Sequence, residues 1–538
     1  MTQKAEPGLF LGVDVGTGSA RAGIFDVSGR MLGTAKRDIA IWQDAPDIAE
    51  QSGDDIWQAV CIATRDAVEH ASIDPARIAG VGFDATCSLV VLGPGGAPLS
   101  VSASGDAARN IIVWMDHRAT GQAARINATG HDVLRYVGGT ISPEMQTPKL
   151  LWLKENLPET YDTAWQFMDL ADFLSWRASG DATRSACTVT CKWTYLAHEQ
   201  RWDADYFHAI GLGDLAEDGF ARIGPRVLPP GTALRKGLTT DAAAAMGLRP
   251  GIAVAAGLID AHAGGLGTVG AQGQPQSNMG YVFGTSSCTM SSTDAPVFVP
   301  GVWGPYYGAM VPGLWVNEGG QSAAGAAIER LISLHPAEMQ ARELAVEAGQ
   351  PLPVWLAHRA AAKAGQLSDS AALAKGLHVV PEFLGNRAPF ADPSARAVIA
   401  GLGMDQGLDS LIALYIAGLC GIGYGLRQIL DAQRAAGIET ERIVISGGAG
   451  QLDLVRQLLA DSAGKPVLAV TAEEPVLLGS AMLGAIACGR FGGLPEAMGA
   501  MSHPSQVFAP SDAHAALHDA RYAAFRALQD AARSASDA

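Results

Sequence analysis

Cysteine is scarce in this sequence, which limits the covalent and metal chemistry that it can support. The 538 residues include seven cysteines, an odd number scattered from Cys61 to Cys488. No CxxC motif occurs, and Cys187 with Cys191 lacks the second pair that a zinc site would require. We therefore expect buried, reduced thiols in a reducing compartment.

Positive charge is also in short supply. Lys and Arg total 38 against 54 for Asp and Glu, which gives a formal net charge of −16. A balance this acidic argues against a nucleic-acid footprint and against adhesion to anionic membranes. It still allows an anionic substrate, because backbone amides or a few basic residues can bind one locally.

Long hydrophobic runs are missing too. Residues 1–8 hold no apolar run before their charges, so we expect no signal peptide. Residues 411–426 are uncharged over sixteen positions, short of the roughly 18–20 residues that a membrane span needs. We interpret them as a core helix and expect a cytoplasmic protein with no membrane or nucleic-acid partner. The sequence leaves a homodimer open.

The hydrophobic content, 48% of the residues, supplies a large core and excludes wholesale disorder. The length allows two to four domains. The opening pattern predicts three strands, a helix capped by Asp54 and a fourth strand, over residues 9–15, 20–27, 31–41, 54–70 and 78–83. This order indicates a β-meander followed by α/β alternation.

The second half repeats this opening. A strand over 278–283, the turn Gly284-Thr285-Ser286-Ser287 and a return strand over 288–292 match the first hairpin, whose turn is Gly16-Thr17-Gly18-Ser19. The two turns lie almost half the chain apart, which favours two related halves that meet near residue 270. Further α/β alternation follows, with a helix over 411–435, a strand over 442–446, a helix over 452–462, a strand over 466–471 and a helix over 475–489. The tail after Met501 is expected to be helical and to pack on the outside.

Glycine-rich segments suggest where phosphates bind. No Walker A motif is present, which excludes a P-loop fold. Gly265–Gly270 matches GxGxxG, but residues 271–277 are too rich in Gly, Gln and Pro to be the helix that a dinucleotide fingerprint opens.

The first turn carries the more informative pattern. Backbone amides at Gly16 and Gly18 form an anion nest, to which Thr17 and Ser19 add hydroxyls and Arg21 a positive charge. Asp14 would repel a phosphate at this turn unless Mg²⁺ lies between them. An ordinary hairpin with turn-forming residues is the alternative.

The second turn, with Gly284 and Thr285, would hold phosphates from the opposite domain. The later turn at Gly448 and Ala449 follows a strand and precedes a helix, so its backbone can approach a flat ring or a sugar closely, although a plain strand-to-helix turn would look the same. Two phosphate turns followed by a Gly-Gly turn resemble the actin-like ATPase superfamily, which binds ATP between duplicated domains.

The candidate general base is Asp260, at the end of an expected strand over 252–259. A carboxylate at a strand end in a cleft can accept a proton from a substrate hydroxyl. The alternative, an N-cap for the next helix, is compatible with that role.

These features together resemble the FGGY carbohydrate kinases over nearly the whole chain, and within them the ribulokinase-type members, D-ribulokinases in particular. The resemblance rests on six segments: DATCSLV at 84–90, WMDHRA at 114–119, SPEMQTPKLLW at 142–152, TCKW at 190–193, NEGGQS at 317–322 and RAVIAGL at 396–402. Two departures weaken a match to xylulokinase or glycerol kinase, though not to the fold. Ala397 stands where the family commonly has Gly, and Leu419-Cys420-Gly421 replaces a usual acid.

The resemblance implies an α/β fold of two actin-like (ribonuclease H-like) domains, 8–269 and 270–538, with an ATP and sugar cleft between them. It implies sugar-binding roles for Cys87, Asp116, Arg118, Glu144, Lys192 and Glu318 beside Asp260, and nucleotide-binding roles for Gln321 and Gly325. We expect Trp114 and Trp193 to be core aromatics.

The expected reaction is ATP- and Mg²⁺-dependent phosphorylation of the terminal hydroxyl of a ketopentose or pentitol, with D-ribulose giving D-ribulose 5-phosphate as the favoured case. Ribitol, L-ribulose or xylulose kinase is the alternative of the same class. A non-catalytic actin-like ATP-binding protein is a rival of another class, although such a protein needs no hydroxyl base. A sugar-sensing repressor would need a DNA-binding extension, for which the N-terminus offers no basic segment.

Overall fold

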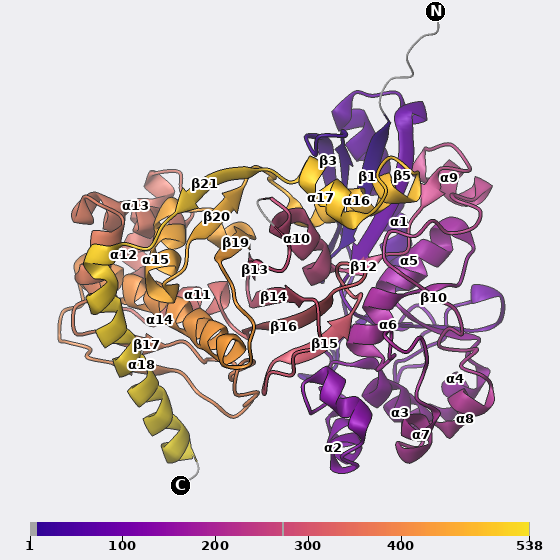
Figure 1. The fold of residues 1–538 in the computed structure, drawn as a ribbon, viewed down its shortest axis with the longest axis horizontal. Coiled ribbons are helices and arrows are strands. Elements are labelled where there is room, and N and C mark those ends of the chain that lie inside the picture. Colours follow the sequence, from indigo (N-terminus) through magenta and orange to yellow (C-terminus); the bar gives the residue numbers. More distant parts are fainter. Residues whose placement is uncertain (1–7, 272–273, 537–538) are drawn as a thin grey trace, which may run out of the picture.

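The computed structural model describes residues 8–271 and 274–536, which form two α/β halves side by side (Figure 1). The sheet of the first half has the strand order β11-β5-β1-β2-β3, and β12 also pairs with β5. Its strands are β1 (Leu9–Val15), β2 (Ser19–Phe25), β3 (Met31–Asp38), β5 (Ile78–Ala85), β11 (Ala253–Val254) and β12 (Leu258–Ile259). A separate, smaller sheet has the order β4-β7-β6-β8, from β4 (Glu50–Gln51), β6 (Leu89–Leu92), β7 (Ile111–Ile112) and β8 (Gln166–Asp169).

The sheet of the second half has the order β15-β16-β14-β13-β19-β20-β21. Its strands are β13 (Asn278–Phe283), β14 (Ser287–Thr293), β15 (Trp303–Tyr307), β16 (Trp315–Gln321), β19 (Arg442–Ser446), β20 (Val467–Val470) and β21 (Pro504–Phe508). β1 pairs antiparallel with β2 and parallel with β5, and β13 pairs in the same senses with β14 and β19. This shared pairing supports the hypothesis of two related halves.

The helices that matter for the site are α1 (Gly53–Ala71), α6 (Ala186–Lys192), α10 (Asp260–Val269), α11 (Gly325–Ser333), α14 (Leu408–Ala435), α15 (Asp453–Ala463), α16 (Pro475–Ala487), α17 (Leu494–Met501) and α18 (Ala515–Ser536). Within the described residues, α14 is the helix long and apolar enough to cross a membrane by composition. Because 72% of its most apolar 18-residue stretch is buried in the protein, the expectation of a core helix is confirmed.

Several local predictions need correction. Ser52, not Asp54, caps α1, because its side chain accepts a hydrogen bond from the Asp55 amide at 3.3 Å. The expected strand over 252–259 is split into β11 and β12, both parallel to β5. The tail after Met501 is not wholly helical, since β21 pairs with β20 before α18 begins.

Glycine lets α16 lie directly on the first sheet, although this helix comes from the second half of the sequence (Figure 1). A Cβ atom added at Gly12, Gly80 or Gly82 would stand 2.1, 1.9 or 2.0 Å from a carbonyl oxygen of α16. Gly267 has the same role between helices, because its Cβ atom would lie 2.0 Å from the Pro475 oxygen. The GxGxxG motif therefore lies in and after α10, where Gly267 serves helix packing.

Candidate active site

Three parallel strands of the first sheet end at one edge, and each delivers a carboxylate there. Asp14 of β1 lies opposite Asp84 of β5 in the register of that strand pair. β12 ends at Ile259, opposite Ala85, so Asp260 follows as the first residue of α10. Because parallel strands present their carboxyl ends on one side of a sheet, the three side chains face a common site.

The crowding of these carboxylates changes their affinity for protons. Burial and then the neighbouring Asp14 raise the pKa of Asp84 well above its usual value. Burial and then the charge of Asp14 raise the pKa of Asp260 to about 6. A carboxylate with a pKa in this range is a competent base near neutral pH.

Asp14 and Asp84 form the pair that could hold a metal ion. Asp14 accepts a hydrogen bond from Arg21 Nε at 2.7 Å, and Asp84 accepts one from Ser480. Asp84 Oδ1 has no donor among the described residues. Two adjacent carboxylates repel each other unless a proton or a cation lies between them, and oxygen ligands suit Mg²⁺. The pair therefore fits the ion predicted at Asp14.

A pocket of about 120 Å³, here called the sugar-side pocket, opens in front of Asp260 and is lined by both halves. It brings together five of the residues predicted to bind sugar: Cys87, Glu144, Lys192, Asp260 and Glu318. The wall also includes Thr86, Trp114, Ser286, Trp303 and Arg387. The small volume and the mixture of acids and bases suit a small, neutral, hydroxyl-rich molecule.

Two cations face the acids of this pocket. Lys192 Nζ lies 4.5 Å from the centre of the Trp303 ring, and the Arg387 guanidinium carbon lies 5.5 Å from the same ring. Burial lowers the pKa of Lys192, but the nearby Glu318 carboxylate and other groups outweigh it, so the net shift is well upward. Lys192 is therefore charged, and it can donate charge-assisted hydrogen bonds.

A second, larger pocket of about 550 Å³ lies in the second half. It brings together the predicted nucleotide residues Gly284, Thr285, Gly325, Gly448 and Ala449. Apolar side chains form its inner wall, including Tyr415, Leu419, Leu452 and Val455. Thr285 lines this pocket and Ser286 lines the smaller one, so a single turn separates the two.

Comparisons with known proteins agree with this geometry. Residues 9–267 match the N-terminal domain, and residues 279–488 the C-terminal domain, of the FGGY family of carbohydrate kinases. The chain belongs to the FGGY carbohydrate kinases.

Individual relatives cover almost the whole FGGY chain. It is 46% identical to the human FGGY carbohydrate kinase domain-containing protein, over 96% of both chains. It is 36% identical to the D-ribulokinase of Saccharomyces cerevisiae, over 90% of this chain and 72% of the relative. The crystal structure of xylulose kinase from Rhodospirillum rubrum shares the fold, with a TM-score of 0.81 at 22% identity and coverage of 98% and 100%. The chain is thus a carbohydrate kinase of two actin-like domains.

The first turn of this FGGY kinase lies outside the two pocket linings as the structure describes them. Gly16 and Gly18 connect β1 to β2, which begins at Ser19, and the Thr17 hydroxyl accepts a hydrogen bond from Trp114 Nε1 at 2.9 Å. Arg21 is engaged by Asp14 and by Glu474, with Nη1 2.8 Å from the Glu474 carboxylate. Contact of this turn with ATP stays a prediction.

Gln321 lies at the end of β16, where it supports the second turn. Its side chain accepts hydrogen bonds from Tyr281 and Ser287 at 3.1 Å each and donates to the Ile422 carbonyl at 3.0 Å. A nucleotide contact of Gln321 also stays a prediction.

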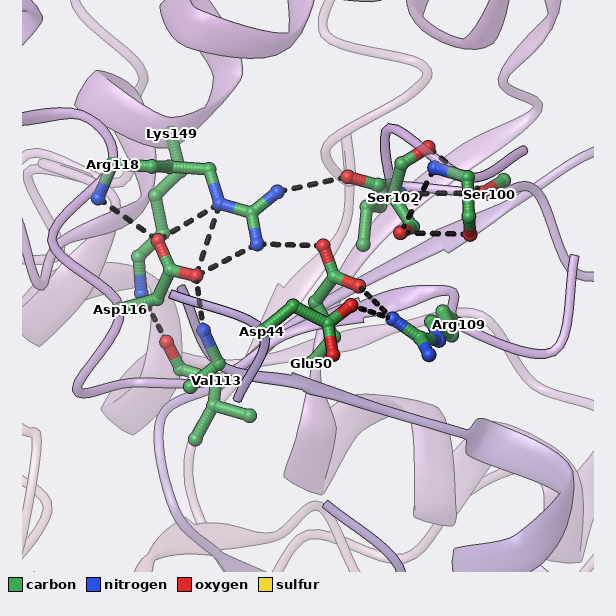
Figure 2. A network of polar contacts seen from close by, with 12 residues as sticks. Asp44, Glu50, Ser100, Ser102, Arg109, Val113, Asp116, Arg118 and Lys149 are labelled. Atoms are coloured by element: carbon green, nitrogen blue, oxygen red, sulfur yellow. Dashed lines mark hydrogen bonds and ion pairs between the residues drawn. The ribbon is translucent and has the colours of Figure 1, made fainter. Parts of the chain in front are cut away.

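Asp116 and Arg118 lie outside the sugar-side lining, in a buried polar network (Figure 2). Arg118 donates to Asp116 through Nε and Nη2, to Glu50 at 2.9 Å and to the Val101 carbonyl at 2.8 Å. Asp116 also accepts from the Ala49 amide at 2.7 Å. Because protein groups occupy both side chains, this geometry favours a role in positioning the segment over sugar contact, which stays a prediction.

The position of Trp114 corrects the expectation that it is a core aromatic like Trp193. Trp193 is buried in the core as expected, but Trp114 lines the sugar-side pocket. Lys149 Nζ donates to the Val113 carbonyl at 3.0 Å and to the Trp114 carbonyl at 3.3 Å, which holds the backbone there, while the ring Nε1 donates to the Thr17 hydroxyl.

Sequence reasoning missed Asp84, Trp303 and Arg387. Asp84 has a readable signal, because an acid at the end of a buried strand repeats the pattern of Asp14 and Asp260. Trp303 and Arg387 lie in segments without a regular pattern, so only the fold brings them to the pocket.

Proposed function

We propose that this FGGY kinase transfers the γ-phosphoryl group of ATP to the terminal hydroxyl of D-ribulose, giving D-ribulose 5-phosphate. The observation that carries the proposal is the turn at Thr285 and Ser286, which joins a nucleotide-sized pocket to a small polar pocket containing Asp260. A hydroxyl held near Asp260 would meet a phosphate held at this turn. FGGY kinases use ATP, which fits the apolar wall of the larger pocket.

In the proposed mechanism, Asp260 accepts the proton of the attacking hydroxyl. Lys192, Glu318 and Glu144 orient the remaining oxygens of the sugar. Backbone amides and hydroxyls at Thr285 and Ser286 stabilise the negative charge of the transferred group. Asp14 and Asp84 would hold Mg²⁺, which neutralises phosphate charge when bound.

The choice of sugar rests on two supports. The yeast relative named a D-ribulokinase is 36% identical, and a ribulokinase of Mycolicibacterium smegmatis is 30% identical over 98% of this chain. Lys192 and Glu318 lie in the segments that resemble ribulokinases and face the same pocket. The similarity to a xylulose kinase structure concerns the fold alone, so xylulose, L-ribulose and ribitol are competitors for the experiment to separate.

The test is an ADP-release assay over D- and L-ribulose, D- and L-xylulose and ribitol. We expect the highest kcat/KM with D-ribulose, and sugar-dependent ADP release about 10²–10⁴-fold slower from the Asp260→Asn variant. A higher kcat/KM with another sugar would overturn the choice of substrate. Absence of sugar-stimulated ADP release with all five would overturn the proposed pentose class.

Two further proposals concern the setting. We propose that the kinase works in a reducing cytoplasm, in keeping with seven cysteines that are all free. We also keep the division 8–269 and 270–538, with α16 as the part of the second segment that packs on the first sheet and α17 packed against α16 and α10. Light scattering after gel filtration will test the homodimer that the sequence leaves open.

A further inference from the structure

A cluster of soft metal ligands lies directly behind the wall of the sugar-side pocket. Cys187 and Cys191 project from α6, and His262 projects from the first turn of α10. Their ligand atoms all lie within 4.8 Å of one another, and all three side chains are fully buried. Lys192, which follows Cys191, and Ala261, which precedes His262, line the pocket. The proposed mechanism uses none of the three.

The spacing of the cluster fits a tetrahedral ion. Cys187 Sγ lies 3.3 Å from His262 Nδ1. Ligands at about 2.3 Å for sulfur and 2.0 Å for nitrogen around Zn²⁺ stand about 3.5–3.8 Å apart, so small side-chain shifts suffice. Two thiolates and an imidazole select zinc-like ions over Mg²⁺ and Ca²⁺, which prefer oxygen.

A disulfide between the two thiols fits less well. Cys187 and Cys191 stand one helical turn apart, where Cβ atoms are about 5–6 Å from each other. A disulfide needs about 3.5–4.5 Å, so it would require α6 to unwind. A metal ion bridges the longer distance without that change.

The far side of the imidazole supplies an independent observation. His262 Nε2 is buried without a hydrogen-bond partner, and Glu318 Oε2 lies 3.9 Å from it. A histidine that binds a metal commonly donates its other N–H group to a carboxylate. Glu318 stands where such a carboxylate belongs, and it also lines the sugar-side pocket.

We propose that Cys187, Cys191 and His262 form an inhibitory binding site for a zinc-like divalent cation, with water in the fourth position. Binding draws Glu318 toward His262 and moves the first turn of α10, which begins with Asp260. Asp260, the base, and Glu318, the carboxylate that binds the sugar, are then no longer in their working positions. A misplacement of about 1 Å can cost about 10²-fold in rate, so we expect at least tenfold inhibition at saturating metal.

The first experiment measures binding without substrate, and its outcome does not depend on which sugar is phosphorylated. Cd²⁺ is titrated into the full-length, reduced protein while the ultraviolet thiolate-to-metal band is recorded. We expect one Cd²⁺ per chain with two thiolates, and loss of this band in Cys187→Ser and Cys191→Ser. Cys420→Ser is the matched control, because Cys420 is an equally buried thiol in α14. Glu318→Gln should weaken Cd²⁺ binding by about 10–100-fold.

The second experiment measures ADP release with Zn²⁺ added over excess Mg²⁺-ATP, each variant being normalised to its own metal-free rate. Wild type and Cys420→Ser should be inhibited and recover with a chelator, whereas Cys191→Ser should resist. Circular dichroism confirms folding, and Cys191→Ala replaces any serine variant that misfolds. Equal Cd²⁺ affinity in wild type and Cys191→Ser, or equal inhibition of both by Zn²⁺, overturns the proposal. Loss of both free thiols on treatment with hydrogen peroxide, without Cd²⁺ binding to the reduced protein, overturns it in favour of a disulfide.

Discussion

At the scale of single residues, Asp260 is the group on which the proposed chemistry depends most. We expect Asp260→Asn to lose about 10²–10⁴-fold in turnover, because an amide cannot accept the hydroxyl proton. Steady-state kinetics and calorimetric ATP binding check this, since ATP affinity should be largely unchanged. Asp241→Asn, an exposed acid in the first turn of α9 (Thr240–Met246), is the control. A folded Asp260→Asn protein with more than about a tenth of wild-type turnover would contradict the assignment.

The raised pKa of Asp260 predicts an acid limb in the pH profile. The base works only when ionised, and its pKa in the folded protein is about 6. We therefore expect kcat/KM to fall about tenfold per pH unit below that value. Lys192 holds this pKa down, so the limb should move to higher pH in Lys192→Met. A limb that stays in place in this variant would mean that another group controls it.

Lys192 itself is predicted to determine affinity for the sugar. Charge-assisted hydrogen bonds are each worth about 1.5–3 kcal/mol, so Lys192→Met should raise the KM for ribulose about ten- to a hundred-fold. The KM for ATP should change far less, because Lys192 lines the sugar-side pocket and not the larger one. Lys154→Met, at the end of α3 (Gln146–Asn156), is the control. A rise in the KM for ATP alone would assign Lys192 to the nucleotide or to an ion pair.

At the scale of elements, the contact of α16 with the first sheet leaves no room for a methyl group. Gly82→Ala should destabilise the protein by about 1–3 kcal/mol, because the added Cβ atom would meet the Ser480 carbonyl. Thermal unfolding measures the loss. Gly499→Ala in α17 has open space and should leave the melting temperature within a degree or two of wild type. Equal melting temperatures for Gly82→Ala and wild type would show that α16 can shift away.

The elements also show what can be predicted from sequence and what cannot. β1, β13 and β19 are confirmed residue for residue, because their apolar runs end at glycine or turn residues. β2 and β3 end earlier than predicted, since pairing with a neighbour decides where a strand stops.

The residues of the site also divide into those that the sequence predicts and those that only the fold brings together. Residues next to a strand end or a glycine turn, such as Asp260 and Thr285, could be predicted as neighbours of the reaction from the chain alone. Arg387 and the Cys187–His262 contact could not, because they join segments that are distant in sequence. Asp116 shows the opposite limit: its motif is recognisable in the sequence, but its hydrogen bond from the Ala49 amide, 67 positions away, is visible only in the fold.

At the scale of the whole molecule, the two halves should close when both substrates bind. The sugar-side pocket takes its walls from both halves, whereas the larger pocket belongs to the second half. The first turn, at Thr17 and Ser19, can therefore reach ATP only if the halves approach each other. Closure would also exclude the water that hydrolyses ATP.

Small-angle scattering measures that closure. The radius of gyration should fall on addition of D-ribulose with a non-hydrolysable ATP analogue, and each ligand alone is the control. An unchanged radius at saturating concentrations of both would mean that the halves are already in their working arrangement.

The packing of α16 on the first sheet has a consequence for biosynthesis. The strands β1, β2 and β5 have all been made once residue 85 has been added, but the helix that covers them ends at Ala487. At about 5–20 residues per second, the ribosome reaches that point roughly 20–80 s later. During this interval the glycine-lined face of the nascent chain is uncovered and open to wrong partners. A shortened messenger that stops after residue 270 would leave it so permanently, and the product should depend on chaperones or precipitate.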